Sequence, residues 1–125
     1  MSHRQLLVID DENDIREVVK LSLQLTEDWT VMTANGGAAG MALALSTEPD
    51  AILLDVMMPD MDGPSTLRIL QRQGATKSIP VIFLTAKVQA ADRQKFMQLG
   101  VWGIIPKPFD PLTLGQQIKD VLSWA

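Results

Sequence analysis

Five short apolar runs alternate along the chain with stretches of helical periodicity, and this order restricts the fold more than any other feature. The runs are rich in Val, Ile, Leu or Thr and lie at residues 6–9, 29–34, 51–54, 81–84 and 103–105. The run at 51–54 has no polar alternation, which is typical of a strand covered on both faces of a parallel sheet. The chain therefore predicts an α/β fold, a doubly wound parallel sheet of five strands with helices on both faces.

Five helices are predicted between and after these strands, at residues 14–26, 37–46, 64–73, 90–99 and from 111 to about 124. Pro64 suits the first turn of the third helix, and Gly74 suits its end. Asp110 is predicted to cap the last helix, with Pro111 at the first helical position. The apolar face of this helix would consist of Leu114, Ile118, Val121 and Leu122.

The first helix is predicted to bury an apolar face and to begin with an acidic turn. The face would contain Ile15, Val18, Val19 and Leu25, widened by Leu21 and Leu23. Acidic residues near a helix start stabilise the helix dipole, so capping alone can explain some of the acids between Asp10 and Asp14. It does not require the adjacent pair Asp10 and Asp11 at the end of a strand.

Polar side chains close four of the five predicted strands. Asp10 and Asp11 follow the first strand, Asp55 the third, Thr85 the fourth and Lys107 the fifth. Each has an ordinary explanation alone: a turn cap for Asp55, a strand-forming residue for Thr85, a solvated edge lysine for Lys107. Because the carboxyl ends of parallel strands open onto one crevice, the four positions together predict a single site.

Lys107 is held between two prolines, Pro106 and Pro108. The first has no backbone N–H, so the fifth strand is expected at an edge of the sheet or ends there. The second biases Lys107 toward an extended conformation, so the backbone directs its ammonium group.

The predicted cluster of carboxylates favours a cation. Two carboxylates about 4 Å apart repel by roughly 4 kcal/mol at an effective dielectric constant of 20. A site of oxygen ligands without His or Cys suits Mg2+, which usually keeps room for phosphate oxygens. Asp55 could then attack a phosphorus atom and form an acyl phosphate, with Lys107 and Thr85 contacting the phosphoryl oxygens.

Composition excludes several other classes of protein. The chain has 125 residues, enough for one domain, and its net charge of -4 does not suit direct nucleic-acid binding. It contains no cysteine, so disulfides and thiolate chemistry are absent. No apolar run is long enough for a signal peptide or a membrane span, so a cytoplasmic protein without membrane contacts is expected.

The motifs LLVIDDE, ILLDVMMPDMDG, PVIFLTA and KPF occur in this order. With them the sequence resembles the receiver domain of two-component response regulators over residues 1–125. The resemblance implies a flavodoxin-like fold with strand order 2-1-3-4-5, a cis peptide before Pro108, and phosphorylation of Asp55 by a histidine kinase, a phosphotransfer protein or a small phosphodonor. It also implies that Asp10, Asp11, Asp55 and the backbone carbonyl of Met57 bind Mg2+, and that Thr85 and Lys107 contact the phosphoryl group.

One position departs from the family pattern. Receiver domains usually carry Tyr or Phe three residues before the lysine, and its rotation is coupled to the threonine. This chain has Ile104 there, so the aromatic half of the switch is expected to be lost while Thr85 can act through the loop that follows it. Met57 and Lys87 match positions that tune the lifetime of the acyl phosphate.

The resemblance also suggests how the domain communicates. It is not expected to be an enzyme beyond its own phosphorylation and dephosphorylation, and it would act as a monomer or weak dimer. Because the sequence stops at Ala125, just after the last predicted helix, no output domain is expected in it, so it is either a stand-alone regulator or a fragment of a larger one. A downstream protein would bind the face made by the fourth helix, fifth strand and fifth helix, near Phe96, Trp102 and Trp124. We expect Trp102 to be exposed for this contact.

Three alternatives stay open. A phosphohydrolase with an aspartyl nucleophile would need a carboxylate where Met57 stands. A flavin- or nucleotide-binding module would need a Gly- or Ser/Thr-rich loop in place of IDDEND. A degenerate receiver that binds its partner constitutively would not need the complete set of acidic, Thr and Lys residues at the strand ends.

Overall fold

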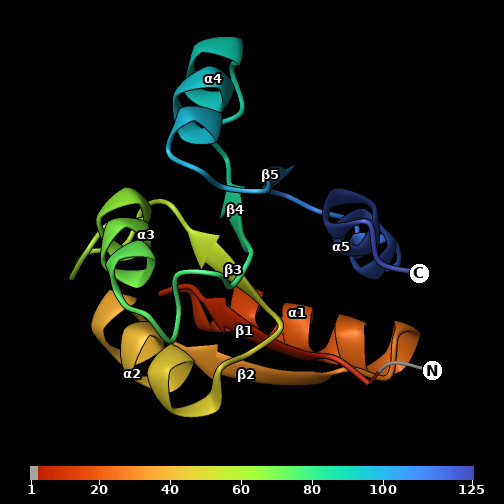
Figure 1. Cartoon of the computed structure of the whole chain (residues 1–125). Coiled ribbons are helices and arrows are strands. Elements are labelled where there is room, and N and C mark those ends of the chain that lie inside the picture. Colours follow the sequence, from red (N-terminus) through yellow and green to blue (C-terminus); the bar gives the residue numbers. More distant parts are fainter. Residues whose placement is uncertain (1–2) are drawn as a thin grey trace.

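A computed structural model describes residues 3–125 as alternating strands and helices (Figure 1). The strands are β1 (Gln5–Ile9), β2 (Thr30–Ala34), β3 (Ala51–Asp55), β4 (Val81–Thr85) and β5 (Gly103–Pro106). The helices are α1 (Asn13–Thr26), α2 (Gly37–Thr47), α3 (Gly63–Arg72), α4 (Ala90–Gln98) and α5 (Leu114–Leu122). The strands form one parallel sheet in the order β2-β1-β3-β4-β5, which confirms the predicted fold class and strand order.

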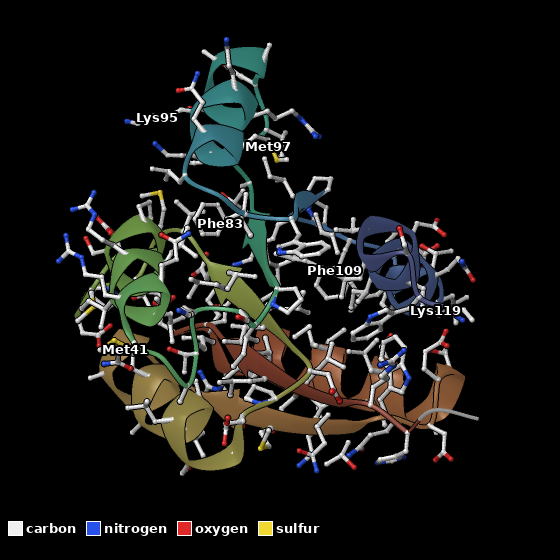
Figure 2. All side chains as sticks on the ribbon, in the orientation of Figure 1. Met41, Phe83, Lys95, Met97, Phe109 and Lys119 are labelled. Atoms are coloured by element: carbon white, nitrogen blue, oxygen red, sulfur yellow. The ribbon has the colours of Figure 1, made fainter. Side chains whose placement is uncertain are left out.

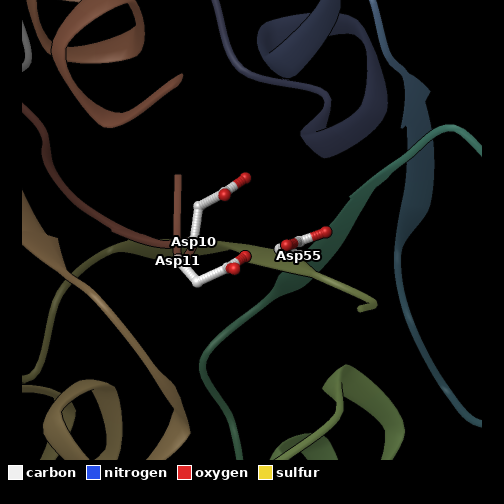
Figure 3. A group of neighbouring side chains, drawn as sticks. All are labelled: Asp10, Asp11 and Asp55. Atoms are coloured by element: carbon white, nitrogen blue, oxygen red, sulfur yellow. The ribbon is translucent and has the colours of Figure 1, made fainter. Parts of the chain in front are cut away.

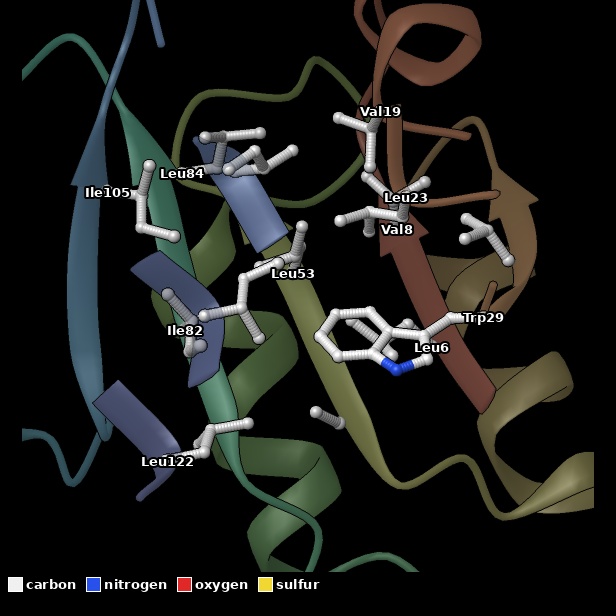
Figure 4. Packing of buried hydrophobic residues seen from close by; sticks show 14 residues of the cluster. Leu6, Val8, Val19, Leu23, Trp29, Leu53, Ile82, Leu84, Ile105 and Leu122 are labelled. Carbon is white, nitrogen blue, oxygen red and sulfur yellow. The ribbon is translucent and has the colours of Figure 1, made fainter. Parts of the chain in front are cut away.

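Side chains that alternate along the strands divide the core into two clusters. All residues of β3 and β4 are buried, so these central strands are covered on both faces, as predicted. Leu6, Val8 and Leu53 face α1 and α5 (Figure 4). Residues one position on, such as Leu7 and Leu54, pack in the cluster that includes residues of α2, α3 and α4. The sheet is therefore the middle of three layers.

The buried face of α1 differs from the predicted one. Val19 and Leu23 are buried, whereas Val18, Leu21 and Leu25 are 39%, 59% and 76% exposed. The helix turns by 100° per residue, so one narrow stripe meets the sheet, and apolar residues outnumber its positions. That stripe includes the polar Ser22, whose hydroxyl donates a hydrogen bond to the carbonyl of Pro111.

The start of α5 also differs from prediction. The helix begins at Leu114, and the residues before it form a turn. The carboxylate of Asp110 accepts a hydrogen bond from Leu112 N–H (2.9 Å), and its carbonyl accepts one from Thr113 N–H (3.1 Å). The second bond spans three residues, which is the spacing of a tight turn rather than of an α-helix. The predicted apolar face is confirmed: Leu114, Ile118 and Leu122 are buried, and Val121 is partly buried against the same cluster.

β5 lies at an edge of the sheet, as Pro106 predicted, and its last residue pairs with Thr85. The peptide bond between Lys107 and Pro108 is cis. Within residues 3–125, no helix has the length and apolar character of a membrane span.

Candidate functional site

Three carboxylates meet where β1 and β3 end (Figure 3). One oxygen each of Asp10, Asp11 and Asp55 lies within 4.8 Å of the others. Asp10 and Asp55 are buried, being 0% and 4% exposed, while Asp11 is exposed. The adjacent parallel strands bring together side chains that are 45 residues apart in sequence, as the strand-end pattern predicted.

The ammonium group of Lys107 lies among these acids. Its Nζ is 2.8 Å from Asp10 Oδ2 and 3.3 Å from Asp55 Oδ1. The Lys107 backbone N–H donates to the carbonyl of Thr85 (2.9 Å), so the β4–β5 ladder continues to the residue that supplies the charge. Glu12 Oε1 lies 3.3 Å from the same ammonium, a contact that the sequence did not predict.

Burial and charge shift two pKa values in the site. Burial raises the pKa of Asp55 from 3.8 to about 6, and the neighbouring Asp10 charge adds to this shift while Lys107 opposes it. Burial opposes the charged form of Lys107, yet the attraction of Asp10 and then Asp55 raises the pKa of Lys107 above its ordinary value. The ammonium is therefore a permanent cation in the site at neutral pH.

The donor set fits Mg2+. Asp10 Oδ2 is buried and receives no well-aligned hydrogen bond from any described residue, despite its close approach to Lys107. Three carboxylates without His or Cys are the ligands of a hard cation. Oxygens that share a Mg2+ ion are at most about 4.2 Å apart, so only a small adjustment of these side chains is needed.

Two hydrogen bonds link the acceptor region to the loops after β3 and β4. Thr85 is buried, and its hydroxyl accepts a hydrogen bond from Lys87 N–H (3.0 Å). Met57 N–H donates to Asp55 Oδ1 (3.3 Å), while the Met57 side chain is 62% exposed. The side chains of Met57 and Lys87 are thus free to meet an approaching molecule.

The family model of the response regulator receiver domain matches residues 6–119. The chain belongs to the response regulator receiver family. The Synechocystis protein "DNA-binding dual master transcriptional regulator RpaA" is 37% identical over 94% of this chain and 48% of its own length. The Pseudomonas aeruginosa "Phosphate regulon transcriptional regulatory protein PhoB" is 34% identical over 98% of this chain and 53% of its own length. The chain therefore spans about half the length of these relatives.

The solved structures support the same assignment. The Vibrio cholerae chemotaxis response regulator CheY4 superposes with a TM-score of 0.89 and 31% identity, covering 96% of this chain and 99% of its own. A Francisella response regulator receiver domain gives a TM-score of 0.86 at 26% identity, covering 97% of this chain and 98% of its own. Receiver domains are signalling domains that bind Mg2+ in an acidic pocket and interact with histidine kinases or phosphotransfer proteins.

The β3–α3 loop of this receiver domain is fixed by close backbone packing. Gly63 N–H donates to the carbonyl of Val56 (2.8 Å). A Cβ atom at Gly63 would lie 2.6 Å from the backbone oxygen of Asp55, so only glycine allows this approach. Asp62 then caps α3 through Ser65 N–H (2.7 Å).

The β3–α3 loop is also tied to α2 by Asp60, a residue whose role the sequence did not reveal. Its two carboxylate oxygens accept hydrogen bonds from Gly37 and Ala38 N–H, each 3.3 Å long. These bonds lower the pKa of Asp60, that from Ala38 most. Asp60 lies 23 residues from the helix start, so no local capping pattern could reveal it, whereas Glu12 could have been noticed because it follows the Asp10–Asp11 pair.

The three aromatic residues expected near the output face have different environments. Trp102 is 54% exposed, as predicted. Phe96 is buried in an edge-to-face contact with Phe83, with ring centroids 5.1 Å apart. Trp124 packs against Trp29 in the same geometry at 5.6 Å, so Phe96 and Trp124 are packing residues.

Ile104, the departure from the receiver pattern, is half-buried and packs against the cluster that contains Phe83. It is paired with Phe83 across β4 and β5. A branched aliphatic side chain in this position is part of the packing between strands.

Proposed function

We propose that this receiver domain accepts a phosphoryl group on Asp55 in a two-component phosphorelay. The proposal is supported above all by the buried Asp55 carboxylate, which lies beside two further carboxylates and 3.3 Å from the Lys107 ammonium. A group that must attack phosphorus needs this combination, because its own charge and that of the incoming phosphoryl group both require compensation.

The chemical step follows from these residues. An Asp55 oxygen forms a bond to phosphorus while the bond from phosphorus to the imidazole nitrogen of a phosphohistidine breaks, and the electron pair stays on that nitrogen. Lys107 stabilises charge on the phosphoryl oxygens, and the Thr85 hydroxyl donates a hydrogen bond to one of them. Bound Mg2+ would supply further positive charge, held by Asp10, Asp11, Asp55 and the Met57 carbonyl.

The donor would be a sensor histidine kinase or a histidine phosphotransfer protein, and small phosphodonors would serve in vitro. The signal would pass through Thr85 and the loop after it, because Ile104 offers no rotating aromatic ring. A downstream protein would bind the face of α4, β5 and α5, where Met97 and Trp102 are exposed. Replacing Trp102 by Ala should weaken that contact.

In this proposal the receiver domain works in the cytoplasm as a monomer or weak dimer. It makes no direct contact with nucleic acid or membrane, consistent with its net charge of -4. Steady hydrolysis of phosphomonoesters is not expected, because the position of a second carboxylate acid–base is occupied by Met57.

The test is incubation with Mg2+ and phosphoramidate or acetyl phosphate, followed by intact mass. We expect one added phosphoryl group, none with EDTA, and none in the Asp55→Asn variant. An adduct that forms without metal, or that persists in Asp55→Asn, would overturn the proposal.

A further inference from the structure

An open groove of about 720 Å³ lies between α3 and α4, beside the candidate acceptor site. Its walls include the side chains that the β3–α3 and β4–α4 loops turn outward, Met57 and Lys87. At the far end, Gln71 Nε2 of α3 donates to the carbonyl of Leu99 after α4 (2.9 Å). The groove therefore extends from the mouth of the acceptor site to a point where the two helices are joined.

The floor of the groove is apolar, and its exposed walls carry cationic side chains. Met58 and Phe96 are buried, and Pro59, Pro64 and Leu99 add apolar surface. Arg68, Lys87 and Lys95 are exposed along the walls. Figure 2 shows Lys95 projecting from the side of α4 nearer α3, whereas Met97 points to the other side. The groove is thus distinct from the α4–β5–α5 face.

Charge complementarity indicates what the groove would bind. None of Arg68, Lys87 and Lys95 forms an ion pair with a carboxylate of the described residues. The lining also contains two acids: Asp62 caps α3 and attracts Arg68, and Asp92 lies in the first turn of α4, where the helix dipole favours it. The three cations outnumber the two acids in the lining, so the groove suits a carboxylate next to a large apolar side chain.

The groove is also connected to the acceptor site through one hydrogen bond. The Thr85 hydroxyl accepts from Lys87 N–H, and it can keep this bond while donating its proton to a phosphoryl oxygen. A shift of Thr85 toward the phosphoryl group would then move Lys87 and the groove wall with it. Phe96 is the one buried residue of α4, so this helix can follow at low cost.

We propose that the groove between α3 and α4 is a second docking site, which binds an acidic protein segment through one large apolar side chain and its neighbouring carboxylates. We further propose that phosphorylation of Asp55 changes its affinity. This second part rests on the proposed function, whereas binding to the unphosphorylated domain does not.

The experiment uses a fluorescently labelled peptide with a central Trp-Leu pair between glutamates, titrated against the complete chain by anisotropy. Two control peptides replace the glutamates by glutamines or the Trp-Leu pair by serines. We expect Lys95→Glu and Arg68→Glu each to weaken binding by about tenfold, since each reverses a charge in the groove. Lys77→Glu, an exposed charge reversal outside the groove, should leave binding unchanged.

Equal binding of the glutamine peptide, or no effect of either groove variant, would overturn the docking site. Circular dichroism checks that each variant is folded. For the coupling, the same titration follows phosphoramidate treatment, with adduct formation measured by mass in the same sample. We expect a change in Kd of about threefold or more. An adduct with unchanged Kd refutes the coupling alone, whereas absence of the adduct refutes the proposed phosphorylation and leaves the peptide result standing.

Discussion

Replacing Asp55 by Asn should stabilise the metal-free protein. The pKa of Asp55 rises from 3.8 to about 6 on folding, chiefly because the carboxyl group is buried. Two pKa units at 1.36 kcal/mol each give a cost of about 3 kcal/mol for keeping this group ionised in the folded state. Asn keeps the shape and removes that cost, although it also ends the contact with Lys107, so we expect a gain of about 1–3 kcal/mol.

The pKa of Asp55 also predicts how the stability difference between Asp55→Asn and wild type changes with pH. The folded state binds the Asp55 proton more tightly than the unfolded state, so the stability from this group is largest below pH 3.8 and is lost as the pH rises through about 6. The advantage of Asp55→Asn over wild type should therefore be full at pH 8 and about half as large at pH 5.

Urea unfolding in EDTA, followed by tryptophan fluorescence, measures this difference. A gain of this size corresponds to at most about 10 °C in Tm for a domain of this length. Asp11→Asn is the matched control, because it removes an exposed carboxylate from the same cluster and should change stability less. Equal or lower stability of Asp55→Asn at pH 8, or a gain that grows toward pH 5, would refute the reasoning.

Three further predictions concern the same site. Gly63→Ala should lower the free energy of unfolding by about 1–3 kcal/mol, because the added Cβ would meet backbone atoms of Asp55. Gly74→Ala is the control, since a Cβ there meets open space and should be tolerated. Chemical denaturation of both variants measures the difference. Lys107→Met removes the ammonium that lowers the pKa of Asp55, so a carbon-detected NMR titration should find that pKa above about 6, and an unchanged value would contradict the assigned cause. Adding Mg2+ at 100 times its Kd should stabilise the protein by about 2.7 kcal/mol, and Asp11→Asn should require a higher Mg2+ concentration for the same shift in Tm.

The strand pattern predicted most of the fold because a strand buried on both faces is an uninterrupted run of apolar residues in the sequence. Runs such as 51–54 and 81–84 contain no polar residue, and the structure confirms that both strands are fully buried. In α1 the same reasoning failed, because apolar residues there exceed the positions that meet the sheet. Periodicity could not distinguish Leu23, which is buried, from Leu25, which is 76% exposed.

The candidate site was predictable where reactive side chains follow the strands directly in sequence. It was less predictable where a residue's role depends on contacts between distant segments. The grouping of Asp10, Asp11 and Asp55 followed from parallel strands that end at one edge. The Asp60 cap on α2 depends on how two loops meet in space. Likewise, the groove between α3 and α4 arises from elements whose own sequences give no sign of it.

The most direct test of the central claim is to locate the phosphoryl group. After treatment with Mg2+ and phosphoramidate, borohydride reduces an aspartyl phosphate to homoserine, and peptide mapping then identifies the modified residue. We predict homoserine at position 55 and at no other acid of the cluster, with none in EDTA. Homoserine at Asp10 or Asp11 in place of Asp55 would contradict the assignment of the acceptor.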